Sequence, residues 1–98
     1  MISKYESMII FAPSLSNEDI EKENKKILTL VADLGGEFIK TDSWGKKQLQ
    51  YEIQKFREGF YLINYFTLDT QKVHEIERLY RLNERIIRHN MIKLEAKE

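Results

Sequence analysis

The hydrophobic residues of this chain follow two different spacings, and each change of spacing marks the boundary of a predicted element. Four segments rich in β-branched and aromatic residues have the length and the loose two-residue alternation of strands. The first ends at Pro13, which cannot continue a strand ladder, and the second contains Gly45, where we expect a bend or bulge. The predicted strands cover residues 5–12, 37–53, 60–68 and 86–94.

Two further segments repeat their apolar residues at helical spacing. Ser16 and Asp19 form a capping box before an apolar stripe that stops at the glycines of residues 35–36. A second helix begins after Asp69 or Thr70, either of which can cap it. The predicted inner stripes are Ile20, Ile27, Val31 and Leu34 in the first helix and Val73, Ile76, Leu79 and Tyr80 in the second.

The order of elements is strand, helix, strand, strand, helix, strand, in which two split βαβ units interleave. Right-handed crossovers place both helices on one face of a four-stranded antiparallel sheet, so the predicted fold class is α+β, a ferredoxin-like sandwich. The first and third strands are central, the second and fourth are edges, and one face stays open. A chain of 98 residues supports one core, so we expect a single domain over residues 1–98 with a short tail that frays from about residue 95.

Strand alternation predicts which side chains leave the helix-covered face. We take Ile9 and Phe11 of the first strand, and Leu62 and Phe66 of the third, to face the helices. Asn64 then also points inward, where it needs hydrogen-bond partners. The open face is expected to carry Glu6, Met8, Ile10, Tyr61, Ile63 and Tyr65.

Charge is balanced overall but not along the chain. Sixteen Lys and Arg against sixteen Asp and Glu give no formal net charge. Residues 1–39 carry four basic and seven acidic side chains, whereas residues 40–93 carry eleven basic and seven acidic. The basic excess is typical of a surface that meets a polyanion or an acidic partner, and equally of a solvated surface of mixed charge.

No residue pattern typical of an enzyme or a metal site occurs. The chain has no Cys, and His74 and His89 lie in separate elements without a second ligand at metal-binding spacing. Phosphate loops, nucleophile elbows and dinucleotide fingerprints are missing from the sequence. We therefore predict no catalysis, metal, cofactor or small-molecule substrate. The apolar runs are far shorter than the roughly 20 residues that cross a bilayer, and no secretory signal is present, so we expect no membrane partner and a cytoplasmic location.

A partial RNA-binding signature lies on the third predicted strand. RNA-recognition motifs carry there a basic-Gly-aromatic-small-aromatic octapeptide whose aromatic residues stack on bases. The glycine is present as Gly59. Glu58, Tyr61 and Leu62 replace the basic residue, the small residue and the second aromatic. One hypothesis is accordingly an autonomous module that binds single-stranded RNA through the open sheet face, with Tyr61 and Tyr65 as stacking platforms.

The predicted hairpin carries the most specific pattern in the chain. It reads Trp44-Gly45-Lys46-Lys47-Gln48-Leu49-Gln50-Tyr51-Glu52-Ile53, with Lys55 following. Together with Tyr5-Glu6, Pro13, Gly59, Tyr61, Arg88 and Lys93, it resembles the S6 family of bacterial small-subunit ribosomal proteins over nearly the whole chain. The family's hairpin usually ends in Leu-Ala-Tyr-Pro-Ile. In this chain Gln50 and Glu52 take the places of the alanine and the proline.

The resemblance implies a structural constituent of the small ribosomal subunit that binds the central domain of its ribosomal RNA. It also implies a heterodimer with ribosomal protein S18. Four basic residues, Lys46, Lys47, Arg88 and Lys93, match the family's pattern. The full set of expected RNA contacts is Lys4, Tyr5, Lys46, Lys47, Lys55, Arg85, Arg88 and Lys93.

S18, or in its absence a second copy of this chain, is predicted to add a strand along residues 38–43 of the second strand. A sheet edge presents unpaired N–H and C=O groups, and Lys40 and the bend at Gly45 protect this one only in part. In the alternative, Phe38 and Ile39 pack under the first helix and the edge stays free. The expected partner contacts are Met8, Ile10, Phe38, Ile39, Thr41, Ser43, Tyr61 and Ile63.

Overall fold

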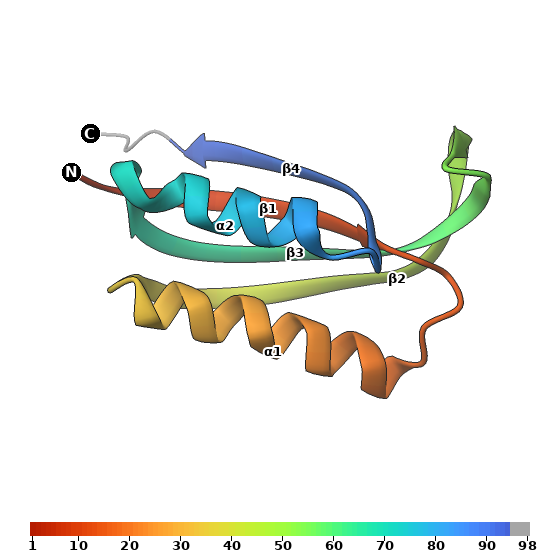
Figure 1. Ribbon diagram of the computed structural model, residues 1–98, viewed down its shortest axis with the longest axis horizontal. Coiled ribbons are helices and arrows are strands. Elements are labelled where there is room, and N and C mark those ends of the chain that lie inside the picture. The colour runs from red at the N-terminus through yellow and green to blue at the C-terminus, as the bar shows by residue number, and fades with distance from the viewer. Residues whose placement is uncertain (95–98) are drawn as a thin grey trace.

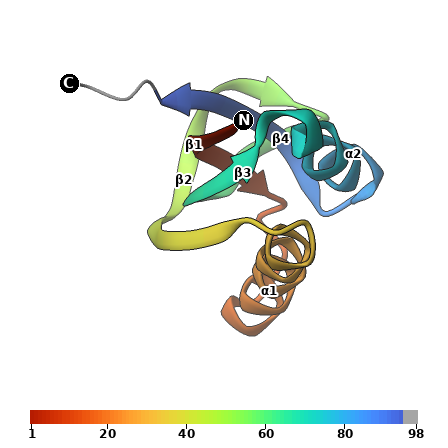
Figure 2. The ribbon, with the colours of Figure 1, turned by 90° about the vertical axis from the view of Figure 1, so that its left-hand side faces the viewer.

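A computed structural model describes residues 1–94 as four strands and two helices arranged in two layers (Figure 1). The elements are β1 (Ile2–Phe11), α1 (Asn17–Asp33), β2 (Glu37–Ile53), β3 (Phe56–Asp69), a 3₁₀ turn (Thr70–Lys72), α2 (Val73–Leu82) and β4 (Ile86–Leu94). All strand pairs are antiparallel in the order β2-β3-β1-β4, and both helices lie on the same side of the sheet (Figure 2). The predicted ferredoxin-like fold, with β1 and β3 central, is confirmed. The expected frayed tail lies outside the described residues.

The turn of the β2–β3 hairpin is shorter than predicted. Only Gln54 and Lys55 separate the strands, with φ angles of 49° and 72°. A two-residue loop with positive φ at both positions matches the twist of the flanking strands, so β3 begins at Phe56 instead of residue 60. Glycine or asparagine normally marks such a turn, and neither is present here.

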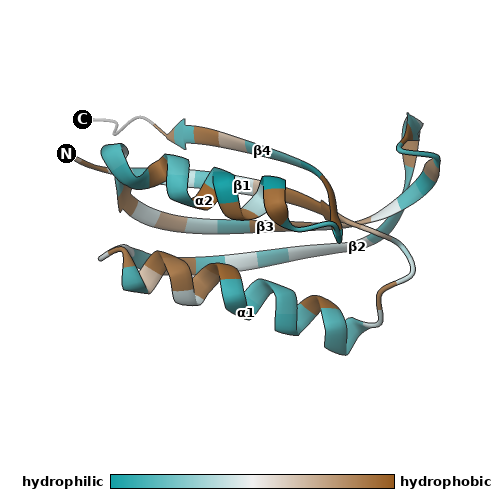
Figure 3. Ribbon diagram, viewed as in Figure 1, coloured by the Kyte–Doolittle hydropathy of each residue, from teal (hydrophilic) through white to brown (hydrophobic). Residues whose placement is uncertain are grey.

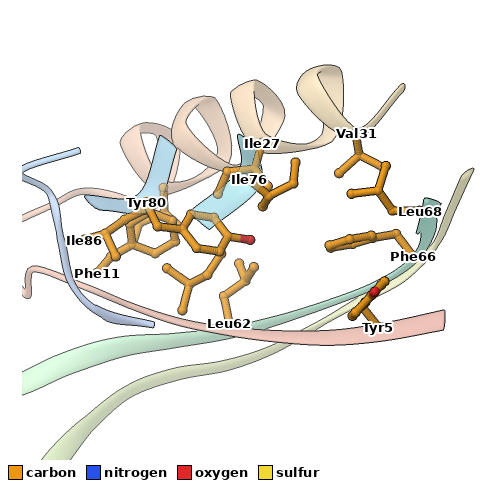
Figure 4. Close-up of a cluster of buried hydrophobic side chains, with 12 residues drawn as sticks. Tyr5, Phe11, Ile27, Val31, Leu62, Phe66, Leu68, Ile76, Tyr80 and Ile86 are labelled. Carbon is orange, nitrogen blue, oxygen red and sulfur yellow. The ribbon is translucent and has the colours of Figure 1, made fainter. Parts of the chain in front are cut away.

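The main core lies between the sheet and the helices (Figure 4). Phe11 and Phe66 from the central strands are fully buried against Ile27 of α1 and Ile76 of α2. Figure 3 shows the brown, hydrophobic bands of both helices alternating with teal ones, as expected for helices with one buried stripe. At the start of α1, the Asp19 N–H donates to the Ser16 Oγ at 3.1 Å, which confirms the predicted cap.

A polar network crosses this core at Asn64, which is fully buried. The Asn64 amide donates to the Asn24 side-chain oxygen at 2.7 Å and accepts from the Thr41 hydroxyl at 2.6 Å. The prediction that Asn64 points inward is therefore confirmed. Its partners come from α1 and β2, so the network joins three elements.

The outer half of the hairpin turns back over the open face of the sheet. β2 has a bulge between Ser43 and Gly45, where Gly45 takes a φ of 77°. Beyond it, Leu49 and Ile53 pack on a second small core formed by Ile10, Ala12 and Ile87. The predicted bend at Gly45 is confirmed, and its consequence is that part of the open face is covered by the protein's own hairpin.

Candidate nucleic-acid and partner interface

Strand register identifies the residues that face away from the helices. β3 places Tyr61, Ile63 and Tyr65 opposite Ile10, Met8 and Glu6 of β1, and this set turns outward as expected. Phe60 and Leu62 lie on the helix side, where both pack with the main core. In the partial RNA-recognition octapeptide these are the two stacking positions, so the motif's aromatic sites are turned into the protein and the motif is not reproduced here.

An open-face hollow of about 220 Å³ lies between the hairpin and the sheet. Its lining includes Met8, Ile10, Leu49, Tyr51, Tyr61 and Arg88. One guanidinium nitrogen of Arg88 donates to the Tyr51 hydroxyl at 2.9 Å, and the Tyr51 side chain stays largely exposed. The hollow thus combines apolar side chains with an aromatic ring and a cation.

A pair of aromatic rings lies beside the hollow. The rings of Trp44 and Tyr61 are stacked, with centroids 6.3 Å apart and planes 15° from parallel. The Lys47 ammonium lies 5.5 Å from the Trp44 ring centroid, within cation–π range. Trp44 is 53% exposed, so a flat ligand can reach this pair from solvent.

The predicted basic residues are divided between two faces. Lys47 pairs with Gly59, and Arg88 with Ile10, so both lie on the open side. Lys46 pairs with Phe60 and shares its helix side. Lys93 pairs with Tyr5, whose side chain lies in the main core, so Lys93 also belongs to the helix side. Lys4 lies on the open side, and Lys55 lies at the hairpin turn.

Arg85 forms an ion pair within the protein. Its guanidinium lies 2.9 Å from a carboxylate oxygen of Glu23, which is only 3% exposed on α1. Burial raises the pKa of Glu23, but hydrogen bonds from Asn83 and Lys26 and the charges of Lys26 and Arg85 outweigh it and lower that pKa overall. The pair links α1 to the start of β4, which accounts for Arg85 without an RNA ligand.

Three of the predicted contact residues are largely buried within the protein, so little of their surface is exposed to a ligand. Tyr5 is 5% exposed and packs in the main core beside Phe66, because its strand parity turns it to the helices. Ile10 and Ile63 face the open side as expected but are 2% and 5% exposed. The hairpin covers Ile10, which packs there with Ala12 and Ile87.

The β2 edge is partly available for pairing. Phe38 and Ile39 are 49% and 44% exposed, so neither is packed away under α1. Within the predicted segment 38–43, the register shift after Phe38 leaves residues 40–43 as the regular part of the edge strand. Thr41 and Ser43 line a groove of about 530 Å³ between this edge and α1, whose other wall includes Ile20 and Asn24.

Tyr51 and Trp44 are the site residues that our sequence analysis did not assign to a contact. Both lie in the hairpin segment near Lys46 and Lys47, and this position was the signal in the sequence that could have identified them. Their exposure depends on the fold-back of the hairpin, which residue spacing does not reveal. Within residues 1–94 no cluster of side chains suited to a metal ion is found, and neither helix is long and apolar enough to cross a membrane.

Comparison with known proteins agrees with the fold. The family model described as ribosomal protein S6 matches residues 4–93. The small ribosomal subunit protein bS6 of Clostridium acetobutylicum is 40% identical over 94 residues, covering 96% of this chain and 99% of the relative. The bS6 protein of Heliobacterium modesticaldum is 36% identical over 90 residues, covering 92% and 94%. The crystal structure of 30S ribosomal protein S6 from Thermotoga maritima superposes with a TM-score of 0.90 at 33% identity, covering 96% of this chain and 89% of that one.

Proposed function

This chain belongs to the ribosomal protein S6 family of the bacterial small ribosomal subunit, which is located in the cytoplasm, and we propose that it binds the subunit's ribosomal RNA together with ribosomal protein S18. The family is a ribosomal protein family and not a known enzyme family. The predicted family membership is confirmed.

One observation carries the RNA proposal: Lys47 and Arg88, from opposite edges of the sheet, both lie on the open side and each contacts an exposed aromatic ring. Cations that flank aromatic rings suit a ribonucleotide chain, because phosphates pair with the cations and bases stack on the rings. Lys4 and Lys55 extend this basic surface, and we retain them as expected phosphate contacts. Lys46 and Lys93 reach RNA in this proposal only if the RNA also passes the edge of the sheet.

S18 is proposed to pair with the regular edge segment, residues 40–43. A strand added there would place alternate side chains over the groove beside α1, where Thr41 and Ser43 supply small neighbours. Phe38 and Ile39 offer exposed apolar contact area next to that segment. This chain has no net charge, so we expect it to supply only part of the positive surface that binds RNA. A basic partner would supply the rest.

A gel-shift experiment tests the proposal, using a transcript of the central domain of the small-subunit ribosomal RNA, with and without S18. We expect weak binding by this chain alone and tight binding when S18 is added. The competing function, an autonomous binder of single strands, is favoured by the exposure of Tyr51 and Trp44. Tight binding of the isolated chain to generic single-stranded RNA would support that function and contradict the partner-dependent one.

A further inference from the structure

We propose that the open-face hollow holds one unpaired base of the bound RNA, stacked on Tyr51. This inference deepens the proposed function and rests on it. It assigns a role to the aromatic and cationic side chains of the hollow, Tyr51 and Arg88. Phosphate binding alone would not use the aromatic ring.

The side chains of the hollow suit a flat heterocycle. Met8 and Leu49 line it together with polar groups, among them the Arg88 guanidinium. Tyr51 is 61% exposed, and Tyr61 contributes a second ring. A base that enters would exchange water for aromatic and aliphatic contacts on its faces, which is the interaction that single-strand binders use.

Arg88 supplies the polar recognition that a base requires. The structure gives its guanidinium a hydrogen bond to the Tyr51 hydroxyl at 2.9 Å and, among residues 1–94, no carboxylate partner. A guanidinium has five N–H donors, so several remain for the edge of a base or for its phosphate. The hydrogen bond also holds the Tyr51 ring at the mouth of the hollow.

Charge favours RNA over a peptide as the occupant. An apolar peptide that filled the hollow would bury Arg88 without an opposite charge, which is costly. A nucleotide brings a phosphate with its base, and Lys47 stands beside the neighbouring Trp44–Tyr61 pair, where the next phosphate would lie.

The base must be unpaired. In a double helix both faces of a base are stacked and its edge is paired, and side chains cannot read the narrow major groove of the A form. Only a base splayed out of a loop, bulge or junction can present its faces to Tyr51. The proposal therefore selects irregular RNA and not a regular duplex.

The experiment measures binding of the central-domain transcript by this chain in complex with S18, at several salt concentrations. Tyr51→Ala is compared with Tyr51→Phe and with the control Leu82→Ala, which removes an exposed apolar side chain of α2, on the helix side of the sheet. We expect Tyr51→Ala to weaken binding about tenfold (about 1.4 kcal/mol) with an unchanged salt slope, because a stacked base is lost and no phosphate contact is removed. Tyr51→Phe should retain most of the affinity, and Leu82→Ala should bind like the wild type.

A second measurement needs no variant: ultraviolet cross-linking of the wild-type complex, with the attached nucleotide located by mass spectrometry. Adducts on Tyr51 or Tyr61 to a nucleotide in an unpaired region are expected. The inference is overturned if wild-type and Tyr51→Ala complexes bind equally, if Leu82→Ala is as harmful, if adducts lie only elsewhere, or if Tyr51→Ala weakens only the association with S18. Failure of the wild-type complex to bind the transcript at all would instead overturn the proposed function.

Discussion

Asn64 of β3 donates a hydrogen bond to the side-chain oxygen of Asn24 on α1 at 2.7 Å, across the centre of the core. Thr41 on the edge strand donates to the same Asn64 side chain. Buried polar groups of this kind are stabilising only while every member keeps its partner. The network therefore ties the position of the β2 edge to the packing of α1.

We predict that Asn64→Ala lowers the free energy of unfolding by about 2–3 kcal/mol, because it leaves polar atoms of buried Asn24 and half-buried Thr41 without their partner. Urea denaturation of the variant and the wild type measures the difference. In a double-mutant cycle, adding Asn24→Ala should cost much less than it does in the wild type. Additive losses would show that the two amides do not act as a pair.

Gly59→Ala is expected to destabilise the protein by about 1–3 kcal/mol, the usual cost of overpacking. A Cβ atom at this position would collide with the Cγ2 of Ile10, which is buried under the hairpin. The melting temperature of Gly59→Ala is compared with that of Glu58→Ala, a change at the exposed neighbouring position. Equal melting temperatures would mean that the hairpin moves freely away from Ile10.

The pH dependence of stability should report on Glu23, whose pKa is lowered in the folded protein. A lowered folded-state pKa gives stability that is present above the unfolded value of about 4.5 and is lost as pH falls through the folded value. Glu23→Gln should therefore be less stable than the wild type at pH 7, and the difference should shrink in acid. Denaturation at a series of pH values tests this, with the exposed Glu21→Gln as a control for loss of charge on α1.

Lys47→Ala should flatten the salt dependence of RNA binding by the complex with S18, by about 0.9 in log-log slope if one duplex phosphate contact is lost. Lys46→Ala is the matched control, since the adjacent lysine faces the other side of the hairpin. We expect a smaller change for Lys46. An unchanged slope for Lys47→Ala would remove this residue from the site.

Amide exchange along residues 40–43 should slow when S18 binds, because a new strand would protect the edge N–H groups. Exchange at the opposite edge, in β4, serves as the internal control. Proline at Thr41 is unsuitable as a probe, since the Thr41 hydroxyl also bonds to buried Asn64. Equal exchange in the free and bound protein at residues 40–43 would place the partner elsewhere.

Sequence patterns predicted the fold well because each element carries its own local signal, such as the Ser16 cap and the inward parity of Phe66. The parity argument also placed Asn64 correctly, although its partners come from distant segments that no spacing identifies. Prediction of the site was weaker. Ile10 was correctly assigned to the open face, yet its burial depends on the path of the hairpin after Gly45, which is a tertiary property.

The position of β1 in the sheet has a consequence for how the chain is made. β1 precedes the other three strands along the chain, yet it pairs on one side with β3 and on the other with β4, where Lys4 lies opposite Leu94. Both of its hydrogen-bonding edges are therefore paired with segments that are translated much later than β1. We expect the nascent chain to gain the complete sheet only when β4 has emerged, so that folding depends on long-range contacts.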